Sequence, residues 1–350
     1  PEKVRTPAMT KAMCIAIVHY HLRPGGVATV IKTASTTLRS QGCRVAVLSG
    51  TPAADVTGLD GYQGVEGLNY SDPSFVLAPE VLLQRLEAGA IKALGCPPDL
   101  WHFHNHSLGK NAVLSQTVRL MADRGQRLLL QIHDFPEDGR PSNYHELLRQ
   151  IGHGHSEVLG ACLYPQAGHV HYATLNSRDR GFLCLAGANS ARVHLLPNAV
   201  ARPPVAQESH KRDAARLFLY PTRAIRRKNI GEFLLWSALG EKGDRFATTL
   251  APTSAGDRAP YERWVQVARE LRLPMEFEIG LRTTIPFETL LRSSQAVVTT
   301  SVAEGFGLAF LEPWQVGRTL VGRNLPELTD EFKKLGLDLR GLYPRLQVPL

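Results

Sequence analysis

Two glutamates set eight positions apart are the first sign of chemistry in this sequence. The stretch SVAEGFGLAFLEPW, residues 301–314, places Glu304 and Glu312 around a Gly-Phe-Gly-Leu core, directly after the apolar run in residues 296–300. If a helix begins near Gly307, its first N–H groups lack intrahelical partners and carry a partial positive charge that attracts anions. Such a stretch could hold a ligand with hydroxyl groups at both ends and an anion between them.

The spacing of the two carboxylates sets the size of that ligand. Glu312 would lie about five residues inside the helix, roughly 7 Å along its axis at ~1.5 Å per residue. This is about the reach from a phosphate to a ribose, so the stretch suits a nucleotide sugar. Glu304 would bind the sugar and Glu312 the ribose, while the amides of Gly307 and Leu308 would bind the diphosphate. Two glutamates at this spacing are also common in ordinary helices, so the pattern does not decide alone.

A cluster of cations supplies a second candidate for binding phosphate. In YPTRAIRRKNI, residues 220–230, four cations fall within six residues, directly after an expected strand. Arginine presents a planar fork and lysine a compact charge, and both suit a diphosphate. The alternative is a solvated basic loop, which the position at a strand end makes less attractive.

A glycine pair follows the first expected strand, in HYHLRPGGVA, residues 19–28. Glycines at the start of a helix allow the backbone to approach a phosphate closely. The stretch is not GxGxxG, and no acidic residue follows at the end of the second strand, so a standard dinucleotide fingerprint is poorly matched. A glycine-rich turn without a ligand stays an alternative.

These stretches need elements that bring them together, and the sequence predicts such elements. Short β-branched runs alternate with longer amphipathic segments, which indicates βαβ units and parallel sheets with helices on both faces. The expected strands are residues 13–18, 44–49, 100–103, 127–132, 170–175, 193–196, 217–220, 246–250, 275–279, 296–300 and 319–321. The expected helices are residues 27–39, 79–93, 111–123, 229–239, 261–271, 286–292 and 307–316.

This alternation breaks once, in the proline-rich and polar stretch 198–213. We therefore predict an N-terminal Rossmann-like domain in residues 1–200, a linker in residues 201–214 and a C-terminal Rossmann-like domain in residues 215–350. Ligands of doubly wound sheets bind beyond the carboxyl ends of the strands. With two such domains, the cleft between them is the expected site.

Composition argues against several other classes of protein. Of 350 residues, 43% are hydrophobic and 21% charged, and no apolar run approaches the roughly 18–20 residues of a membrane span. The N-terminus lacks the apolar core of a secretory signal, which favours a cytoplasmic location. The five cysteines form no CxxC pair, which argues against a disulfide framework or a zinc site. The net charge of +8 suggests an anionic partner, but without a long Lys/Arg tract we expect no nucleic acid.

In their order along the chain, the three stretches resemble family 4 of the retaining glycosyltransferases, the glycosyl transferases group 1. In that family a Gly-Gly loop follows the first strand, Arg-x4-Lys follows the first strand of the second domain, and E-x7-E closes the donor site. The resemblance implies the GT-B fold, two Rossmann-like, doubly wound parallel-sheet domains that face a cleft. The matching residues, within about residues 13–328, are Gly25, Gly26, Arg223, Lys228, Glu304 and Glu312.

The resemblance also implies a role for each matching residue. Arg223 and Lys228 would hold the donor diphosphate and stabilise its charge as the glycosyl bond breaks. Glu304 would bind the donor sugar and Glu312 the ribose. Backbone of the remaining donor-binding residues would contact the diphosphate and the sugar, and these residues are Gly25, Gly26, Phe306, Gly307 and Leu308. Because cations replace a metal in this scheme, neither a metal nor a cofactor is expected.

His133, in QIHDFP after a first-domain strand, looks like the family's histidine that approaches the donor sugar and the acceptor, and it completes the catalytic set. No carboxylate is well placed to act as a nucleophile. A retaining reaction is therefore expected to proceed by attack of the acceptor on the face of the sugar from which the diphosphate departs. Asp134 is the one nearby candidate for a covalent nucleophile.

Three histidines alternate in WHFHNH, residues 101–106, which is a feasible metal arrangement. Because no carboxylates accompany them, a polar cleft wall that touches the acceptor is the better explanation. The acceptor-side candidates are His104, Asn105, Lys110 and Asn176. A helix-capping role also explains Asn176.

The predicted function is a metal-independent, retaining transfer of a hexose-like sugar from a nucleotide diphosphate sugar to a hydroxyl acceptor. The alternatives are a catalytically silent nucleotide-sugar-binding protein and, on the same fold, a sugar-nucleotide epimerase or a phosphorylase. The base, the sugar, the acceptor and the oligomeric state are left open by the sequence. Many members of that family glycosylate lipids, so a basic surface leaves peripheral membrane association open. The segment after residue 325 is shorter than the family's usual helical tail, so either the tail is short or the domain is truncated.

Overall fold

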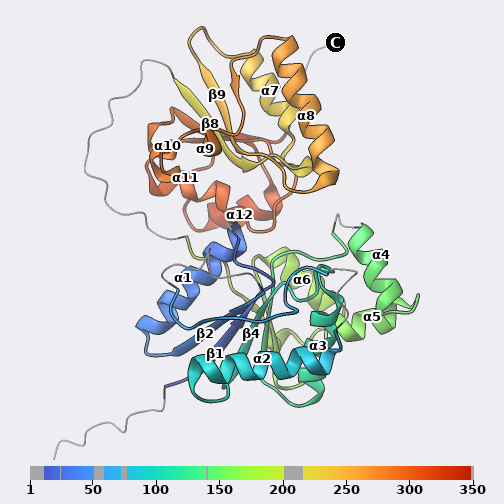
Figure 1. Cartoon of the computed structure of the whole chain (residues 1–350). Helices are drawn as coiled ribbons and strands as arrows, with labels where there is room; N and C mark the ends of the chain where they lie inside the picture. The colour runs from blue at the N-terminus through green and yellow to red at the C-terminus, as the bar shows by residue number, and fades with distance from the viewer. Residues whose placement is uncertain are drawn as a thin grey trace, which may run out of the picture. The chain divides into compact units, whose positions relative to one another are not determined.

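The computed structural model of the chain describes residues 12–23, 25–50, 59–71, 77–138, 141–200 and 216–347. The chain divides into two compact units, residues 1–199 and 200–350, and each contains one sheet flanked by helices (Figure 1). The expected pair of parallel-sheet α/β units is confirmed. The predicted linker, residues 201–214, lies outside the described residues.

The sheet of the first unit has the strand order β3-β2-β1-β4-β5-β6-β7, and every neighbouring pair is parallel. Strand β1, CIAIV, is buried at every residue, as expected for a strand covered on both faces. The bounds are Cys14–Val18 (β1), Arg44–Ser49 (β2), Tyr62–Gly64 (β3), Leu100–His104 (β4), Leu128–Ile132 (β5), Val170–Thr174 (β6) and Val193–Leu195 (β7).

Four helices of the first unit begin at an asparagine cap or at a proline, which are α3 and α6 in the first case and α2 and α4 in the second. Asn111 Oδ1 accepts the Leu114 N–H at 3.0 Å at the start of α3, and Asn176 Oδ1 accepts the Asp179 N–H at 2.8 Å at the start of α6. The helices are Gly26–Ser40 (α1), Pro79–Leu94 (α2), Ala112–Asp123 (α3), Pro141–Gln150 (α4), Ser156–Leu163 (α5) and Ser177–Leu185 (α6), with a 3-10 turn at Ser190–Arg192 (η2).

The sheet of the second unit has the strand order β10-β9-β8-β11-β12-β13, again parallel throughout. Its strands are Leu217–Arg223 (β8), Arg245–Leu250 (β9), Met275–Glu276 (β10), Ala296–Thr299 (β11), Leu320–Arg323 (β12) and Leu342–Tyr343 (β13). Its helices are Arg226–Lys228 (η3), Ile230–Ala238 (α7), Ala255–Glu270 (α8), Ile279–Arg282 (α9), Phe287–Ser293 (α10), Leu308–Phe310 (η4), Glu312–Gln315 (α11) and Pro326–Lys334 (α12).

Both sheets reverse their strand order at one point, between β1 and β4 in the first unit and between β8 and β11 in the second. In open α/β sheets, ligands bind beyond the carboxyl ends of the strands at this switch point. The glycine pair follows β1, the Arg-x4-Lys stretch follows β8 and the two-glutamate stretch follows β11. Topology therefore places each of the three stretches at a switch point of its own unit.

One predicted helix, residues 307–316, is wrong. The structure has the 3-10 turn Leu308–Phe310, then Leu311, and then the four-residue helix Glu312–Gln315. The physical reason is Pro313, whose missing N–H and bulky ring are incompatible with a continuous helix through residue 309. Glu312 consequently begins a short helix and does not lie a turn and a half inside a long one.

Smaller differences follow from weak local patterns. Strand 275–279 ends at Glu276, and Ile279 already begins α9. Helix α8 begins at Ala255 and runs through Pro260, six residues earlier than expected. The sequence analysis missed β3, α4, α5, α12 and β13. Among the described residues, no helix is both long enough and apolar enough to cross a membrane.

Candidate functional site

The centre of the second unit's candidate site is an ion pair between Lys228 Nζ and Glu304 Oε1. Lys228 ends the 3-10 helix η3 just after β8, and Glu304 lies in the loop after β11. Their side chains are only 13% and 8% exposed. The structure thus joins two predicted catalytic residues that are 76 positions apart in the chain.

A hydrogen-bond network between β8 and the loop after β11 holds this pair. The buried Tyr220 hydroxyl donates to the Lys228 carbonyl at 3.0 Å and lies 2.9 Å from Ser301 Oγ. Ser301 Oγ in turn donates to Glu304 Oε1 at 2.6 Å. Thr300 Oγ1 also donates to the Lys228 carbonyl, at 3.0 Å. Buried hydroxyls therefore position both the cation and the carboxylate.

Glu304 is held in its ionised form. Burial alone would raise the pKa of its carboxyl, but the charges of Lys228 and Arg227 and the hydrogen bonds from Lys228 and Ser301 outweigh burial. The net pKa of Glu304 lies below its ordinary value. Lys228 and Ser301 both contact Oε1, so the two contacts concentrate on one carboxylate oxygen.

Glu312 lies at the start of α11 and is half-buried. Burial raises the pKa of its carboxyl, and the charge of Lys228 opposes that rise. Lys228 therefore acts electrostatically on both glutamates of the two-glutamate stretch, although the long helix expected to space them is absent. The two carboxylates differ, because Glu304 is firmly ionised and Glu312 is more easily protonated.

The segment between the glutamates is a tight turn packed on the core. The Phe306 ring is buried and meets Phe332 edge-on, with ring centroids 5.7 Å apart. Gly307 has φ +82°, and a Cβ added there would lie 2.7 Å from the Phe310 ring. Gly307 is thus required by both backbone conformation and space. Leu308 begins a 3-10 turn of only three residues, so positive charge for an anion comes here from side-chain cations and not from a long helix dipole.

Arg223 is the last residue of β8, and its Nη1 donates to the Ala251 carbonyl just after β9, at 3.0 Å. It lies at the same sheet edge as Lys228, but the group that it contacts is a backbone oxygen and not a carboxylate. A guanidinium held in this way keeps its charge and has further N–H groups to offer.

The first unit places the glycine pair at the start of α1. Gly25 is exposed and extended, with φ 168°, and a Cβ added there would meet only the Arg23 carbonyl oxygen at 3.9 Å. Neither the backbone conformation nor the protein's own packing requires glycine at this position. Gly26 is the first residue of the helix and is also exposed.

Histidines gather at the carboxyl edge of the first unit's sheet. His104 Nδ1 lies 2.8 Å from His133 Nε2, and the two rings stack with centroids 5.1 Å apart. His19 Nδ1 lies 3.0 Å from the His104 carbonyl oxygen. His104 and His133 are both buried, and His104 Nε2 has no hydrogen-bond partner within the part of the chain that the structure describes. The structure therefore brings together His133 from the predicted catalytic set and His104 from the predicted acceptor set.

Asn105 organises the loop that carries His133. Its backbone has φ +57°, a left-handed conformation that asparagine tolerates better than most residues. Its Oδ1 accepts the N–H of His133 at 2.7 Å and that of Asp134 at 3.2 Å. The Tyr20 hydroxyl donates to the Asn105 carbonyl at 2.6 Å. The side chain of Asn105 is thus used inside the protein, and its predicted acceptor role stays a prediction.

The histidines of this edge are neutral. Burial lowers the pKa of His19, His102 and His106 to about 4 and that of His133 to about 3. Burial also lowers the pKa of His104 well below its ordinary value, and the neighbouring histidines add to the effect. Each ring therefore has one N–H and one unprotonated nitrogen at neutral pH.

The metal arrangement considered for residues 101–106 does not form among the described residues, which contain no group of three or more His, Cys, Asp or Glu side chains able to hold a metal. His102 Nε2 lies 2.9 Å from Gln131 Oε1, and His106 Nε2 lies 2.8 Å from the Leu163 carbonyl oxygen. The rings of the stretch are thus occupied by different partners.

The remaining acceptor candidates have identifiable structural roles. Lys110 Nζ lies over the Tyr70 ring, 5.5 Å from its centroid, and is half-buried. Asn176 is buried and caps α6, and its Nδ2 also donates to Asp179 Oδ2 at 2.9 Å. The capping explanation for Asn176 is confirmed. An acceptor role for either residue stays a prediction.

The sequence analysis missed three residues that build the charged site: Tyr220, Arg227 and Ser301. Arg227 lies within the cation cluster, but the cluster alone does not tell which cation acts on Glu304. Tyr220 and Ser301 are 81 positions apart, and each looks like an ordinary strand-end residue. No local pattern could have identified them.

Comparison with known proteins agrees with this architecture. No family model matches the chain. The chain is 27% identical over 355 residues to the mannosylglucosyl-3-phosphoglycerate synthase of Petrotoga mobilis, and the match covers 91% of this chain and 66% of that protein. The chain thus spans slightly less than two thirds of the relative's length.

Solved structures extend the comparison to the fold. HepE of Anabaena, solved with UDP and glucose, superposes with a TM-score of 0.62 at 16% identity, covering 88% of this chain and 80% of HepE. A glycosyltransferase of Rickettsia africae superposes with a TM-score of 0.63 at 14% identity, covering 92% of this chain and 82% of that one. The two parallel-sheet units match glycosyltransferase structures of the GT-B class, and the chain has that fold.

Proposed function

We propose that this chain is a glycosyltransferase that moves a hexose-like sugar from a nucleoside diphosphate sugar to a hydroxyl acceptor, with retention of anomeric configuration. The observation that carries the proposal is the position of Lys228. It is ion-paired to Glu304 and acts electrostatically on Glu312, at the switch point of the second unit's sheet. The names of the Petrotoga and Rickettsia proteins support the reaction class.

In this proposal the cations of the second unit receive the leaving diphosphate. Lys228 and Arg223 would neutralise the charge that grows on the diphosphate as the glycosyl bond breaks, and Arg227 would add to their field. Side-chain cations would do the work that a divalent metal does in other phosphate sites, so the reaction is proposed to need neither metal nor cofactor. A nucleotide ligand is supported by HepE, which has been solved with UDP-glucose.

The glutamates would hold the two ends of the donor substrate. The Glu304 oxygen that is not engaged by Lys228 and Ser301 would accept hydrogen bonds from the sugar, and Glu312 would accept hydrogen bonds from the ribose. Phe306, Gly307 and Leu308 would contribute backbone N–H groups to the sugar and phosphate. Gly25 and Gly26 would leave room for the diphosphate. This role would explain a glycine at position 25, where the protein's own packing does not require one.

Retention is proposed to proceed by attack on the face that the diphosphate leaves. A double displacement needs a carboxylate nucleophile beside the anomeric carbon. Glu304 is a poor candidate, because its lowered pKa and its ion pair with Lys228 reduce its basicity. His133 would lie near the donor sugar and the acceptor and would contact them as a neutral imidazole.

The acceptor is proposed to be a small anionic glycoside with a free hydroxyl. The name of the Petrotoga mobilis relative, mannosylglucosyl-3-phosphoglycerate synthase, supports a phosphorylated product, and the net charge of +8 supports an anionic partner. A peripheral membrane lipid is the other acceptor class to be tested.

The decisive experiment follows nucleotide release from UDP-, GDP- and ADP-sugars, each with and without glucosyl-3-phosphoglycerate or vesicles of anionic lipid. We expect one nucleotide sugar to be hydrolysed slowly alone and faster with an acceptor, and NMR of the product to show the anomeric configuration of the donor. Nucleotide-sugar binding without turnover would identify a silent binding protein instead. An inverted product would refute retention, and C2- or C4-inverted free nucleotide sugar would indicate an epimerase.

Calorimetry of UDP or GDP binding tests the cation that carries the proposal. Lys228→Ala should weaken nucleotide diphosphate binding at least 10-fold, whereas Lys333→Ala, a matched change at an exposed lysine of α12, should leave it unchanged. Equal affinities of the Lys228→Ala and wild-type proteins would remove the basis of the donor-site assignment.

A further inference from the structure

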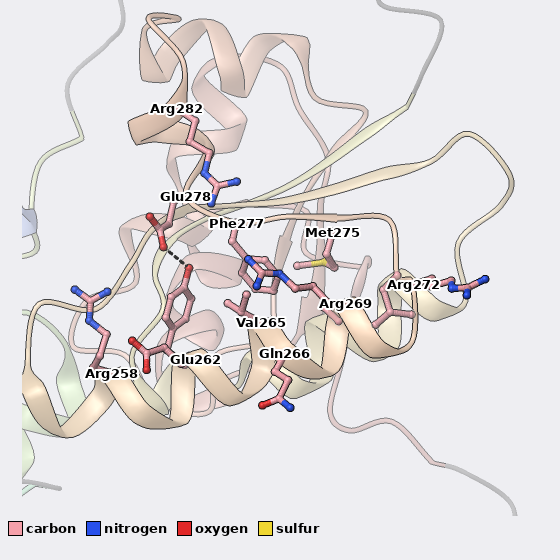
Figure 2. Close-up of a pocket in the computed structure, with 13 residues that line it drawn as sticks. Arg258, Glu262, Val265, Gln266, Arg269, Arg272, Met275, Phe277, Glu278 and Arg282 are labelled. Atoms are coloured by element: carbon pink, nitrogen blue, oxygen red, sulfur yellow. Dashed lines mark hydrogen bonds between the residues drawn. The ribbon is translucent and has the colours of Figure 1, made fainter.

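A groove of about 490 Å³ lies at the edge of the second unit's sheet, between α8 and the segment formed by β10 and α9 (Figure 2). Its floor is apolar and includes the buried residues Tyr261, Ala268 and Phe277. Its rim carries four exposed arginines, which are Arg258, Arg269, Arg272 and Arg282. None of the residues proposed to bind the nucleotide sugar lines this groove.

The arginines of this rim have no carboxylate partners of their own. Among the described residues, no hydrogen bond or ion pair is made by any of the four guanidinium groups. Other arginines of the same unit behave differently, since Arg216, Arg245 and Arg323 form ion pairs with nearby carboxylates. The groove is lined by four arginines and only two glutamates, so its lining carries a net positive charge. Of those glutamates, Glu278 already accepts the Tyr261 hydroxyl at 2.8 Å.

The side chains converge over the apolar floor. In Figure 2, Arg269 reaches from α8 and Arg282 from α9 toward Phe277, whereas Arg272 points away from the other labelled groups. Arg258 and Arg282 are also close enough to the Tyr261 phenol to act on it electrostatically. The guanidinium groups of Arg269 and Arg282 thus extend toward an aromatic surface, and a planar guanidinium fork matches the oxygens of a phosphate.

We propose that this groove binds a small organic phosphate whose apolar body lies on Phe277 and Tyr261 and whose phosphate contacts Arg269 and Arg282. A phosphate monoester carries close to two negative charges at pH 7, which matches the excess of arginines over glutamates on the rim. The volume is sufficient for a ligand of one ring with its phosphate. The proposal concerns a second ligand site and does not rest on the proposed transferase activity.

Calorimetry with phenyl phosphate on the full chain tests this site. Phenyl phosphate should bind at least 10-fold more tightly than phenol or inorganic phosphate, because only the ester uses both the floor and the rim. The double variant Arg269→Glu/Arg282→Glu should weaken its binding at least 10-fold. Arg263→Glu on the same helix α8 is the matched control, since Arg263 is exposed and does not line the groove.

Saturating UDP separates this site from the nucleotide-sugar site. The affinity for phenyl phosphate should be unchanged when UDP is present, and competition would show that the groove is part of the donor site and overturn the proposal. Equal weakening by Arg263→Glu, equal affinity for inorganic phosphate, or no binding of phenyl phosphate at millimolar concentration would overturn it as well. Thermal unfolding of each variant shows whether it is folded.

A second and independent observation concerns two thiols in the first unit. Cys14 Sγ and Cys96 Sγ lie 3.0 Å apart, although the residues are 82 positions apart in the chain. Cys14 begins β1 and is buried, whereas Cys96 is half-buried in the segment between α2 and β4. Arg44 Nη1 lies 3.9 Å from Cys96 Sγ, so the Cys96 side chain is held at the surface side of the pair by a polar contact.

We infer that Cys14 and Cys96 form a reversible disulfide in the presence of a low-molecular-weight disulfide such as oxidised glutathione. The Cys96 thiolate attacks one sulfur of the oxidant, which releases one glutathione and leaves a mixed disulfide on Cys96. The Cys14 thiol then attacks the Cys96 sulfur, and the second glutathione leaves with the proton. The two protein thiols are oxidised, and one molecule of oxidised glutathione is reduced to two of glutathione. A movement of about 1 Å would bring the sulfurs to bonding distance.

Peptide mapping without reductant tests this pair. After incubation with oxidised glutathione, peptides containing Cys14 and Cys96 should be found cross-linked, and dithiothreitol should separate them. The oxidised chain should also unfold at a higher temperature, because the bond would tie the start of β1 to the segment that leads into the neighbouring strand β4. Cys96→Ser should abolish both effects, and Cys184→Ser should change neither. Stable glutathionylation of Cys96 without a cross-link, or a cross-link to another cysteine, would overturn the inference.

Discussion

The carboxyl edges of the two sheets are built from opposite kinds of side chain. In the second unit the edge is charged: Lys228 acts electrostatically on Glu304 and Glu312, and Arg227 acts on Glu304. In the first unit the edge is neutral, with stacked imidazoles and an asparagine that binds backbone N–H groups. Twelve of the thirteen histidines lie in residues 1–199, and none follows His210.

This difference teaches how each edge can treat a charged ligand. Lys228 can exchange its contact with Glu304 for contacts with a diphosphate, because a diphosphate also presents anionic oxygens to the lysine. Buried neutral histidines offer directed hydrogen bonds without attracting or repelling charge strongly. The charged edge therefore suits a diphosphate leaving group, and the neutral edge suits the hydroxyl groups of a sugar or an acceptor. Four predictions test the contrast, from the largest expected effect to the smallest.

Removing the carboxylate of Glu304 from the charged edge should have the largest effect. Glu304→Ala should lower turnover about 1000-fold, which corresponds to ~4 kcal/mol of transition-state stabilisation. It should also lower stability by about 2 kcal/mol, because the ion pair between the largely buried Lys228 and Glu304 would be lost. Steady-state kinetics and urea unfolding measure the two effects. Glu288→Ala, which removes the half-exposed partner of Arg292, is the control and should change neither. Unchanged turnover in Glu304→Ala would remove Glu304 from the site.

Mild acid should destabilise the neutral edge before the charged one. An unfolded histidine has a pKa of about 6.5, whereas His19 and His102 have folded pKa values of about 4. Between these values the unfolded chain binds more protons, so stability falls as the pH falls from about 6.5 to about 4. One such histidine contributes about 3 kcal/mol over that range.

The charged edge should lose stability only at lower pH. The folded pKa of Glu304 is lowered, so its contribution is present above the unfolded value of about 4.3 and is lost below it. The raised pKa of Glu312 acts in the opposite direction and favours the folded state as the pH falls. Hydrogen exchange at pH 7 and pH 5, corrected for intrinsic rates, should show protection falling in β4 and β5 but not in β8 and β11. An equal loss in both sheets would contradict this contrast.

Replacing the asparagine of the neutral edge should have an intermediate effect. Asn105→Ala removes the acceptor for the N–H groups of His133 and Asp134. It also leaves at φ +57° an alanine, which tolerates this left-handed conformation less well than asparagine does. We expect a loss of about 2 kcal/mol in unfolding free energy. Asn105→Gly removes the same acceptor but relieves the backbone, so it should cost less. If the alanine and glycine variants are equally stable, the backbone conformation contributes nothing.

The smallest effect is expected at the cap of α6, which belongs neither to the Lys228 ion pair nor to the stacked histidines. Asn176→Ala should lower stability by about 1 kcal/mol through loss of the cap of α6, with turnover per folded molecule unchanged. Asn176→Ser should restore most of that stability, because serine also caps. A loss of turnover with normal stability would instead support the acceptor role predicted for Asn176.

Local sequence patterns were sufficient for most of the fold. Strand β1 is a continuous apolar run because parallel strands are buried on both faces, and strand β2 was predicted with its observed bounds. Local patterns failed where burial was slight or where one residue outweighed periodicity. Helix α4 has only Leu147 buried, and Pro313 divides the helix expected after Gly307.

The sequence by itself determined which residue types stand after β1, β8 and β11, because strand-end positions follow from alternation along the chain. It did not determine their partners. The contact of Lys228 with Glu304 joins positions 76 apart, and the contact of His104 with His133 joins positions 29 apart. Only the folding of parallel strands side by side brings such residues to one edge. The same folding excludes water, which keeps the histidines neutral, whereas the field of Lys228 and Arg227 keeps Glu304 charged.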